Sequence, residues 1–250
     1  DEMIIGEKRN IPWFVYNAMM KSGTLHILVV SGFNVGIISF IIFIILKLIR
    51  LPRKSRFILT VSLLIVYCLI TGASNPVVRS TVMAIVFIIA YLIKREPDIY
   101  NSLGIAAIFI LMANPRQLFD IGFQLSFVSV LSIIYIYPRI KLFLRIESLK
   151  SRVLKFLLEG CLVSFSAWLG TMGLIAYYFK MFSPVTVLAN IFIVPLAALI
   201  TLSGISLVII GSIFPTLAPF FAFSTELEVF VLLKINALLI SLPFAYYYLP

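Results

Sequence analysis

One stretch of the sequence combines apolar residues with side chains that can do chemistry. Between Ser22 and Gly36, an apolar run contains the chain's single histidine, His26, together with glycines, serines and Asn34. A helix that only crosses a bilayer needs none of these. Small residues let helix backbones approach closely, and buried polar side chains need partners inside the protein. This stretch is therefore the first candidate for a functional site.

Three further polar segments interrupt the apolar sequence and are candidates for its partners. They are 73–80, 114–120 and 181–190, and each contains a proline. Arg79 lies in the first and Asp120 ends the second. Isolated charges within a membrane are costly and tend to pair. We predict a structural ion pair between these two side chains.

The residues that would support an enzyme or a metal site are missing from the sequence. No second histidine and no nearby carboxylate accompanies His26, so metal binding lacks support. The chain has no phosphate-binding Gly-rich loop, no His-Glu-x-x-His motif and no nucleophile beside a base. We expect no catalytic residue, no metal and no cofactor.

The composition is that of a membrane protein. Of 250 residues, 62% are hydrophobic and 12% are charged, whereas soluble domains average about 45–50% and about 25%. The apolar runs do not alternate as the strands of a β-barrel do. We predict an all-α, polytopic helical integral membrane domain.

Apolar runs long enough to cross a bilayer set the expected elements. About eight spans are expected, over 25–49, 57–73, 77–93, 99–113, 121–137, 156–179, 184–211 and 225–248. The seventh run contains Pro195 and Gly204 and is too long for one straight helix, so we expect a broken or strongly tilted helix there. After this helix we expect a turn or a short re-entrant piece. Residues 1–24 are interpreted as an extracytoplasmic segment with an interfacial amphipathic helix, and 25–250 as the transmembrane domain. A helix packed on the core is the alternative for that first helix.

The basic residues agree with this topology. If the chain starts outside, twelve Lys and Arg residues fall in the inner loops 50–56, 94–95 and 139–155, against six in the outer segments. Cytoplasmic loops collect basic residues. All four polar segments then lie at the outer ends of the helices, where they suggest an outward-opening cavity.

Several of these segments carry a family resemblance. The first motif is His26-Ile27-Leu28-Val29-Val30-Ser31-Gly32-Phe33-Asn34-Val35, and the second is Asn75-Pro76-Val77-Val78-Arg79-Ser80. The third is Asn114-Pro115 with Asp120-Ile121-Gly122-Phe123-Gln124-Leu125-Ser126-Phe127. The fourth is Ser183-Pro184 with Ala189-Asn190. In this order, over about 22–196, the segments resemble the competence domain of the ComEC family of bacterial natural transformation. Asn34 stands where that family usually has a second histidine, and an amide does not titrate near neutral pH.

The resemblance implies a channel in the bacterial inner membrane that passes single-stranded DNA into the cytoplasm while the other strand is degraded outside. It also implies an extracytoplasmic DNA receptor, with OB and nuclease domains outside these residues. ATP would be used by a helicase-type partner, and both a single chain and an oligomer fit the sequence. The runner-up is an ion-coupled secondary transporter of a small solute, because broken helices with midplane polar groups also serve that task.

We assign a set of residues to the translocation path or its motif. They are His26, Ser31, Gly32, Asn34, Asn75, Pro76, Arg79, Arg116, Asp120, Gln124, Ser126, Asn190 and Lys234.

Each of these assignments has a structural alternative. His26 fits a helix-capping role as well as a path-lining one, and Ser31 to Gly36 fits a tight helix contact as well as a discontinuous helix. Arg79 or Arg116 could contact DNA phosphates instead of pairing with a carboxylate. For Lys234, in the last apolar run, we expect a position facing the pore or paired with a glutamate.

Overall fold

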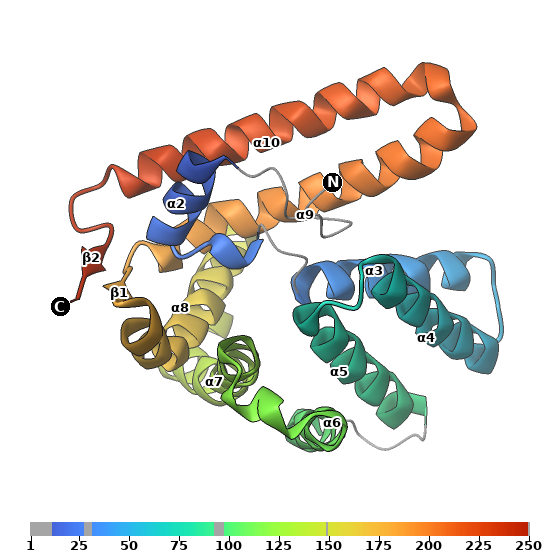
Figure 1. The fold of residues 1–250 in the computed structure, drawn as a ribbon, viewed down its shortest axis with the longest axis horizontal. Coiled ribbons are helices and arrows are strands. Elements are labelled where there is room, and N and C mark those ends of the chain that lie inside the picture. Colours follow the sequence, from blue (N-terminus) through green and yellow to red (C-terminus); the bar gives the residue numbers. More distant parts are fainter. Residues whose placement is uncertain (1–11, 28–31, 93–97, 149, 250) are drawn as a thin grey trace. The chain divides into compact units, whose positions relative to one another are not determined.

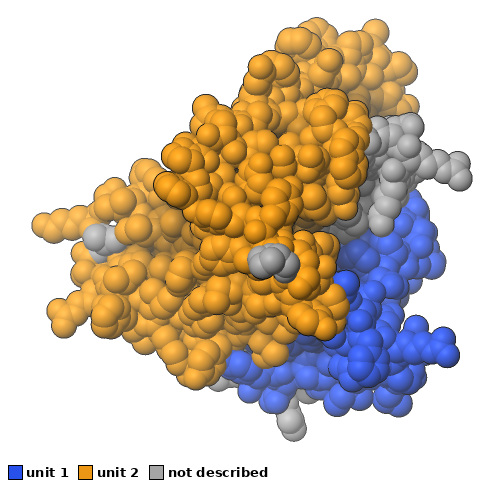
Figure 2. Space-filling model, turned by 60° about the vertical axis from the view of Figure 1, so that its left-hand side comes forward, with its two compact units in different colours: residues 1–7, 29–127 blue, residues 8–28, 128–250 orange. Residues whose placement is uncertain are grey.

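The computed structural model describes residues 12–27, 32–92, 98–148 and 150–249. Nearly all of this described chain is helical, which confirms the all-α prediction apart from one small pair of strands (Figure 1). The chain forms two compact units that are discontinuous in sequence (Figure 2). Unit 1 comprises 1–7 and 29–127, and unit 2 comprises 8–28 and 128–250.

Unit 1 is a group of short helices. They are α3 (Gly32–Leu48), α4 (Arg53–Ile70), α5 (Asn75–Leu92), α6 (Ile99–Ala113) and the 3-10 helix η2 (Pro115–Phe119), followed by the first two turns of α7 (Ile121–Phe143). Helices α3, α4 and α5 pack against one another, and α6 packs on α5. Their core is formed by Val35, Phe57, Leu64, Val77 and Ile88. Each of the three helices therefore contributes apolar residues to one shared core.

Unit 2 contains the longer helices. It comprises α2 (Trp13–Lys21), η1 (Leu25–Ile27), the remainder of α7, η3 (Ile146–Ser148), α8 (Arg152–Phe179), β1 (Met181–Phe182), α9 (Thr186–Ile213), η4 (Pro215–Leu217), α10 (Ala218–Ile240) and β2 (Tyr247–Tyr248). Helices α9 and α10 form an antiparallel hairpin, α8 packs on α9, and α2 packs on α10 (Figure 1).

A helical stripe on α9 explains this packing. Its buried residues recur every three or four positions, at Ala189, Ile193, Ala197, Ile200 and Gly204. Such spacing places side chains on one face of a helix. Small residues at three of these positions let a neighbouring backbone approach closely.

Several predicted elements have the expected bounds and others do not. Helix α6 coincides with the span predicted at 99–113. The single span predicted at 25–49 is instead divided between η1 and α3. Of the broken or strongly tilted helix predicted over 184–211, the break is wrong, because α9 is one continuous helix with Pro195 inside it, and the tilt stays a prediction. Proline removes one backbone hydrogen bond, a loss that a well-packed helix tolerates.

The chain around 139–155 is also more helical than predicted. Helix α7 runs six residues past the expected end at 137, and α8 starts four residues before 156.

The last helix starts and ends earlier than 225–248, and the chain after it turns back to form β2. Strand β2 pairs with β1 in antiparallel register, Met181 opposite Tyr248.

Three of the described helices, α7, α8 and α9, are long and apolar enough to cross a membrane by length and composition. Helix α10 carries Glu226, Glu228 and Lys234 within its sequence. The total of eight spans stays a prediction.

Candidate functional site

The ion pair predicted in unit 1 is confirmed. Arg79 of α5 donates from Nη1 to Oδ1 of Asp120, 3.3 Å away. The arginine is only 3% exposed, whereas the aspartate side chain remains partly accessible. A guanidinium removed from solvent needs such a partner, because an isolated buried charge is strongly unfavourable.

Asp120 also fixes the start of α7. The same Oδ1 accepts a hydrogen bond from the backbone N–H of Phe123 at 2.9 Å, which is the geometry of an N-terminal helix cap. Four residues on, Gln124 donates from Nε2 to the carbonyl of Leu118 at 3.1 Å. The corner between η2 and α7 is therefore held by two side chains of the predicted motif.

Two glycines allow the close contacts of this junction. A Cβ atom added at Gly122 would lie 2.8 Å from Nη2 of Arg79 and 3.0 Å from Oδ1 of Asp120. A Cβ added at Gly32 would lie 2.6 Å from Oγ of Ser80, whose hydroxyl donates to the carbonyl of Pro76 at 2.8 Å. We call this set, Gly32, Arg79, Ser80, Asp120 and Gly122, the unit 1 junction.

The other predicted residues of unit 1 differ in exposure. Asn34 is buried on α3, Asn75 is exposed at the first position of α5, and Ser126 is half-buried on α7. Arg116 is exposed on η2. Ser31 falls outside the described residues.

In unit 2, Ser183 connects segments that are far apart in sequence. Its hydroxyl lies 2.7 Å from the carbonyl of Lys21 and 3.3 Å from that of Ala245. The Ser183 carbonyl accepts from Nε1 of Trp168 at 2.9 Å and from Oγ1 of Thr186 at 2.8 Å. We call Lys21, Trp168, Ser183, Thr186 and Ala245 the unit 2 junction.

The turn after α2 supports this junction. Gly23 has a left-handed φ of 72°, and a Cβ there would collide with the Thr186 side chain. Glycine is therefore required both by the backbone and by the space. The Ser22 and Thr24 hydroxyls lie 2.7 Å apart beside it.

A hydrogen bond with Tyr246 raises the pKa of Lys21, whose Nζ also lies 5.0 Å from the centre of that ring.

The remaining predicted residues of unit 2 make local contacts. The exposed His26 places Nδ1 3.2 Å from the carbonyl of Gly23, so it makes a capping-type contact. Asn190 of α9 donates to Oγ of Ser164 on α8 at 2.9 Å. Lys234 is exposed and lies 5.5 Å from the centre of the Phe230 ring. No ion pair joins Lys234 to a glutamate among the residues that the structure describes.

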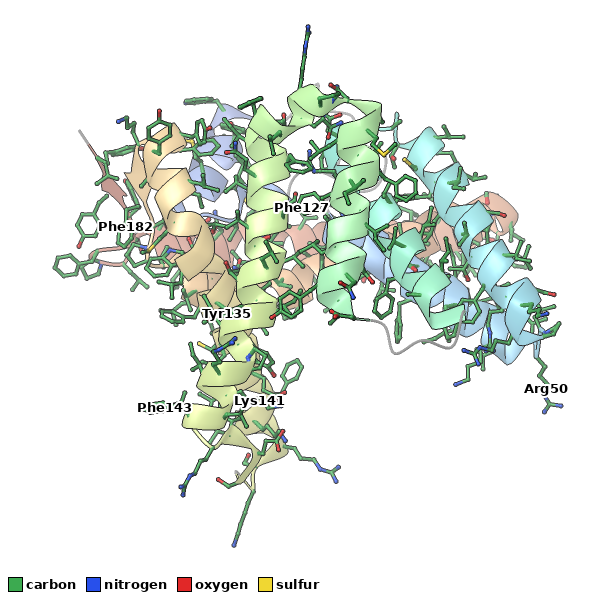
Figure 3. All side chains as sticks on the ribbon, turned by 90° about the horizontal axis from the view of Figure 1, so that it is seen from below. Arg50, Phe127, Tyr135, Lys141, Phe143 and Phe182 are labelled. Atoms are coloured by element: carbon green, nitrogen blue, oxygen red, sulfur yellow. The ribbon has the colours of Figure 1, made fainter. Side chains whose placement is uncertain are left out.

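The basic region between α7 and α8 projects as a pair of helix ends. Figure 3 shows Lys141 and Phe143 on this projection. Lys141 lies 3.3 Å from Glu147 and 3.1 Å from Glu159. The stretch 139–155 carries six Lys and Arg residues against the single acid Glu147, so its cations are in excess.

The sequence prediction missed several of these contacts. Trp168 and Ala245 gave no local signal, since both lie in apolar sequence and meet Ser183 only in the fold. Ser80 and Gly122 could have been found, because Ser80 follows Arg79 directly and Gly122 lies two residues after Asp120 in the predicted motifs. Across the described ranges, no three His, Cys, Asp or Glu side chains gather as metal ligands.

These features define an α-helical protein of the membrane type, in which polar side chains gather where helices begin and end. The family model for the Competence protein matches residues 3–250, so the chain belongs to the Competence protein family.

Two curated proteins are similar to it. ComE operon protein 3 of Bacillus subtilis (strain 168) is 30% identical over 202 residues, which cover 81% of this chain and 25% of that protein. An uncharacterized protein of Aquifex aeolicus (strain VF5) is 30% identical over 217 residues, covering 86% of this chain and 48% of that one. The chain thus spans a quarter to a half of the relatives it matches. No solved structure matches it.

Proposed function

We propose that this chain is the channel domain that passes single-stranded DNA across the bacterial inner membrane during natural transformation. The observation that carries the proposal is the family match, which covers residues 3–250. The name of the Bacillus subtilis relative, a ComE operon protein, agrees with a role in competence.

The two arginines of these segments, Arg79 and Arg116, suit different roles. Arg79 is buried and already paired with Asp120, so it holds the corner of α5 and α7 in place. Arg116 is exposed on the neighbouring η2 and is the better candidate for a phosphate contact. A strand with one negative charge per nucleotide needs cations and polar groups along its path.

The proposed topology places the start of the chain outside the cell and uses about eight spans. The excess of basic residues around 139–155 supports a cytoplasmic position for that end of α7 and α8. Proposed partners are an extracytoplasmic DNA receptor, nuclease and OB domains outside these residues, and a cytoplasmic helicase-type ATPase. Oligomers of this domain would be compatible with the same route.

Uptake of labelled DNA by a transformable host tests the proposal, with the substitutions made in the full-length protein. We expect Arg116→Glu to reduce DNA in the cytoplasm at least tenfold, with surface binding and membrane abundance unchanged. Arg116→Lys should retain part of the uptake, because it keeps the charge but loses the bidentate contact. Lys180→Glu is the matched control, since it reverses another exposed, outer cation.

If Lys180→Glu reduced DNA uptake as much as Arg116→Glu, the cause would be a general effect of charge, which would contradict a specific role for Arg116. Gly32→Leu tests the junction itself, because it forces a bulky side chain against Ser80. Normal uptake by Gly32→Leu and Arg116→Glu, at normal abundance, would contradict the channel and favour the small-solute transporter.

A further inference from the structure

The turn between α3 and α4 carries the largest group of cations in unit 1. Five Lys and Arg side chains fall within ten residues, and we call them the basic turn: Lys47, Arg50, Arg53, Lys54 and Arg56. Helices α3, α4 and α5, which pack against one another, contain no acidic residue. Figure 3 shows Arg50 extending away from the helices at this turn. The three helices therefore offer no charge of their own to balance the basic turn.

Two guanidinium groups of the basic turn lie over aromatic rings. Cζ of Arg56 lies 4.9 Å from the centre of the Phe43 ring, and Cζ of Arg53 lies 5.9 Å from the centre of the Phe57 ring. The centres of the two rings are 5.6 Å apart, and Phe57 belongs to the core of unit 1. A ring face holds a guanidinium in place without using its N–H donors. The core of unit 1 thus gives these two side chains a fixed base.

One donor of Arg56 lacks an acceptor. Its Nε is removed from solvent, and no atom of the described chain accepts a hydrogen bond from it. A buried donor in that state costs free energy. Carboxylate and phosphate oxygens are the acceptors that fit the guanidinium fork best, and the three packed helices hold no carboxylate. An anionic group from outside the chain would supply the missing acceptor.

The start of α4 adds to the attraction for an anion. The helix begins at Arg53 after Pro52, which provides no side-chain cap, and its first turn has no acidic residue. The first N–H groups of a helix lack partners within the helix and carry partial positive charge. Arg53 and Lys54 add two cations to the same turn, an arrangement that the helix dipole disfavours. A bound anion would offset both sources of positive charge.

The neighbours of these cations favour a lipid as the source of the anion. Leu48 and Ile49, between the cations, are 75% and 64% exposed at the end of the apolar helix α3. A phospholipid presents a phosphate next to acyl chains, which matches cations flanked by exposed apolar side chains. A nucleic-acid strand would need exposed aromatic faces for its bases. Phe57 is the only aromatic residue in 44–59, and it is buried.

We propose that the basic turn binds the headgroup of an anionic phospholipid, with Arg56 donating to the phosphate and Leu48 and Ile49 contacting the acyl chains. Binding gives Arg56 its acceptor and offsets the cations in the first turn of α4. The topology proposed above puts 50–56 on the cytoplasmic side, where anionic lipids make the bilayer surface negative. The lipid would hold the α3–α4 hairpin, and with it this end of unit 1, at the membrane surface.

Native mass spectrometry of the full-length protein in detergent tests the site. Titration with dioleoyl phosphatidylglycerol or dioleoyl phosphatidylcholine gives the dissociation constant of the first bound lipid, and we expect the wild type to prefer phosphatidylglycerol. Arg56→Gln should weaken phosphatidylglycerol binding about fivefold, the factor for one basic residue near an anionic surface, and leave phosphatidylcholine binding unchanged. Arg56→Lys should also weaken it, because lysine keeps the charge but loses the planar fork.

Arg152→Gln is the matched control. It removes an exposed cation from the first turn of α8, where the Ser151 side chain already caps the helix, so phosphatidylglycerol binding should be unchanged. Should Arg56→Gln fail to fold, Lys54→Gln changes an exposed cation of the basic turn and is expected to weaken binding about fivefold as well.

Several results would overturn the proposal. Equal affinity of the wild type for the two lipids, or equal weakening by Arg56→Gln and Arg152→Gln, would contradict a site at the basic turn. Full binding by Arg56→Lys would show attraction by charge alone. A single-stranded oligonucleotide that displaces phosphatidylglycerol from the wild type, but does not bind Arg56→Gln, would assign the site to nucleic acid instead. The inference does not need DNA as cargo, so this test and the uptake test fail independently.

Discussion

At the scale of single residues, the unit 1 junction is held by two glycines and by the ion pair between the buried Arg79 and the partly exposed Asp120. Arg79 and Asp120 lie 41 positions apart in sequence and meet at 3.3 Å. Removing Asp120 would leave the buried Arg79 guanidinium without its partner, at a cost of about 3–5 kcal/mol. The same carboxylate caps the start of α7 through the Phe123 N–H, so its loss would also loosen that helix end.

The glycines give a direct test of how tight this junction is. We expect Gly32→Ala to lower the thermal unfolding temperature of the purified protein, because its Cβ would lie 2.6 Å from Oγ of Ser80. The cost is expected to be about 1–3 kcal/mol, as for other overpacked sites. Gly36→Ala is the control from the next turn of the same helix, since nothing lies within 4 Å of its added Cβ.

A second substitution should reverse the effect. Ser80→Ala removes Oγ and leaves Ser80 Cβ at 3.4 Å, an ordinary contact. Gly32→Ala with Ser80→Ala should therefore recover most of the lost stability. Equal destabilisation by Gly32→Ala and Gly36→Ala would instead show that the contact with Ser80 is unimportant.

At the scale of elements, Ser183 joins α2, α8, α9 and the C-terminal segment through its hydroxyl and carbonyl. We expect Ser183→Ala to raise amide hydrogen exchange in α2 and β2 severalfold while leaving α4 unchanged. Ser212→Ala serves as the control, because that exposed hydroxyl bonds only to the carbonyl of Ile209 in its own helix. Unchanged exchange in both α2 and β2 would show that Ser183 does not connect them.

The sequence predicted an element best where the residues that define its ends lie next to it in the chain. Helix α6 was predicted with its observed bounds from an apolar run that leads into Asn114-Pro115, and in the structure Asp98 caps its start. Charge pairing likewise predicted Arg79 with Asp120. The ends of α7 and α8 were misplaced because basic residues were taken as loop residues, although Lys and Arg are good helix formers. Strand β2 was missed because its partner β1 lies more than 60 residues away.

At the scale of the whole molecule, the proposed topology makes a prediction about sides of the membrane. In a background with Cys68 and Cys161 replaced, we expect Arg116→Cys to react with an impermeant thiol reagent in intact cells. Lys150→Cys, in the segment between α7 and α8, should react only after the membrane is opened. Both positions are exposed in the fold, so access depends on the side alone. Labelling of both residues from outside would contradict the eight-span order.

The discontinuity of unit 2 has a consequence for how the protein is made. Lys21 leaves the ribosome long before Ser183, whose hydroxyl lies near the carbonyls of both Lys21 and Ala245. At about 5–20 residues per second, the interval is on the order of tens of seconds. During that time Val15 and Met19, which are buried in the finished fold, have no covering helix. The stacked rings of Trp13 and Tyr16, 5.8 Å apart, suit a lipid headgroup layer. Helix α2 would thus rest at the membrane surface as a biogenesis intermediate and dock on α10 last.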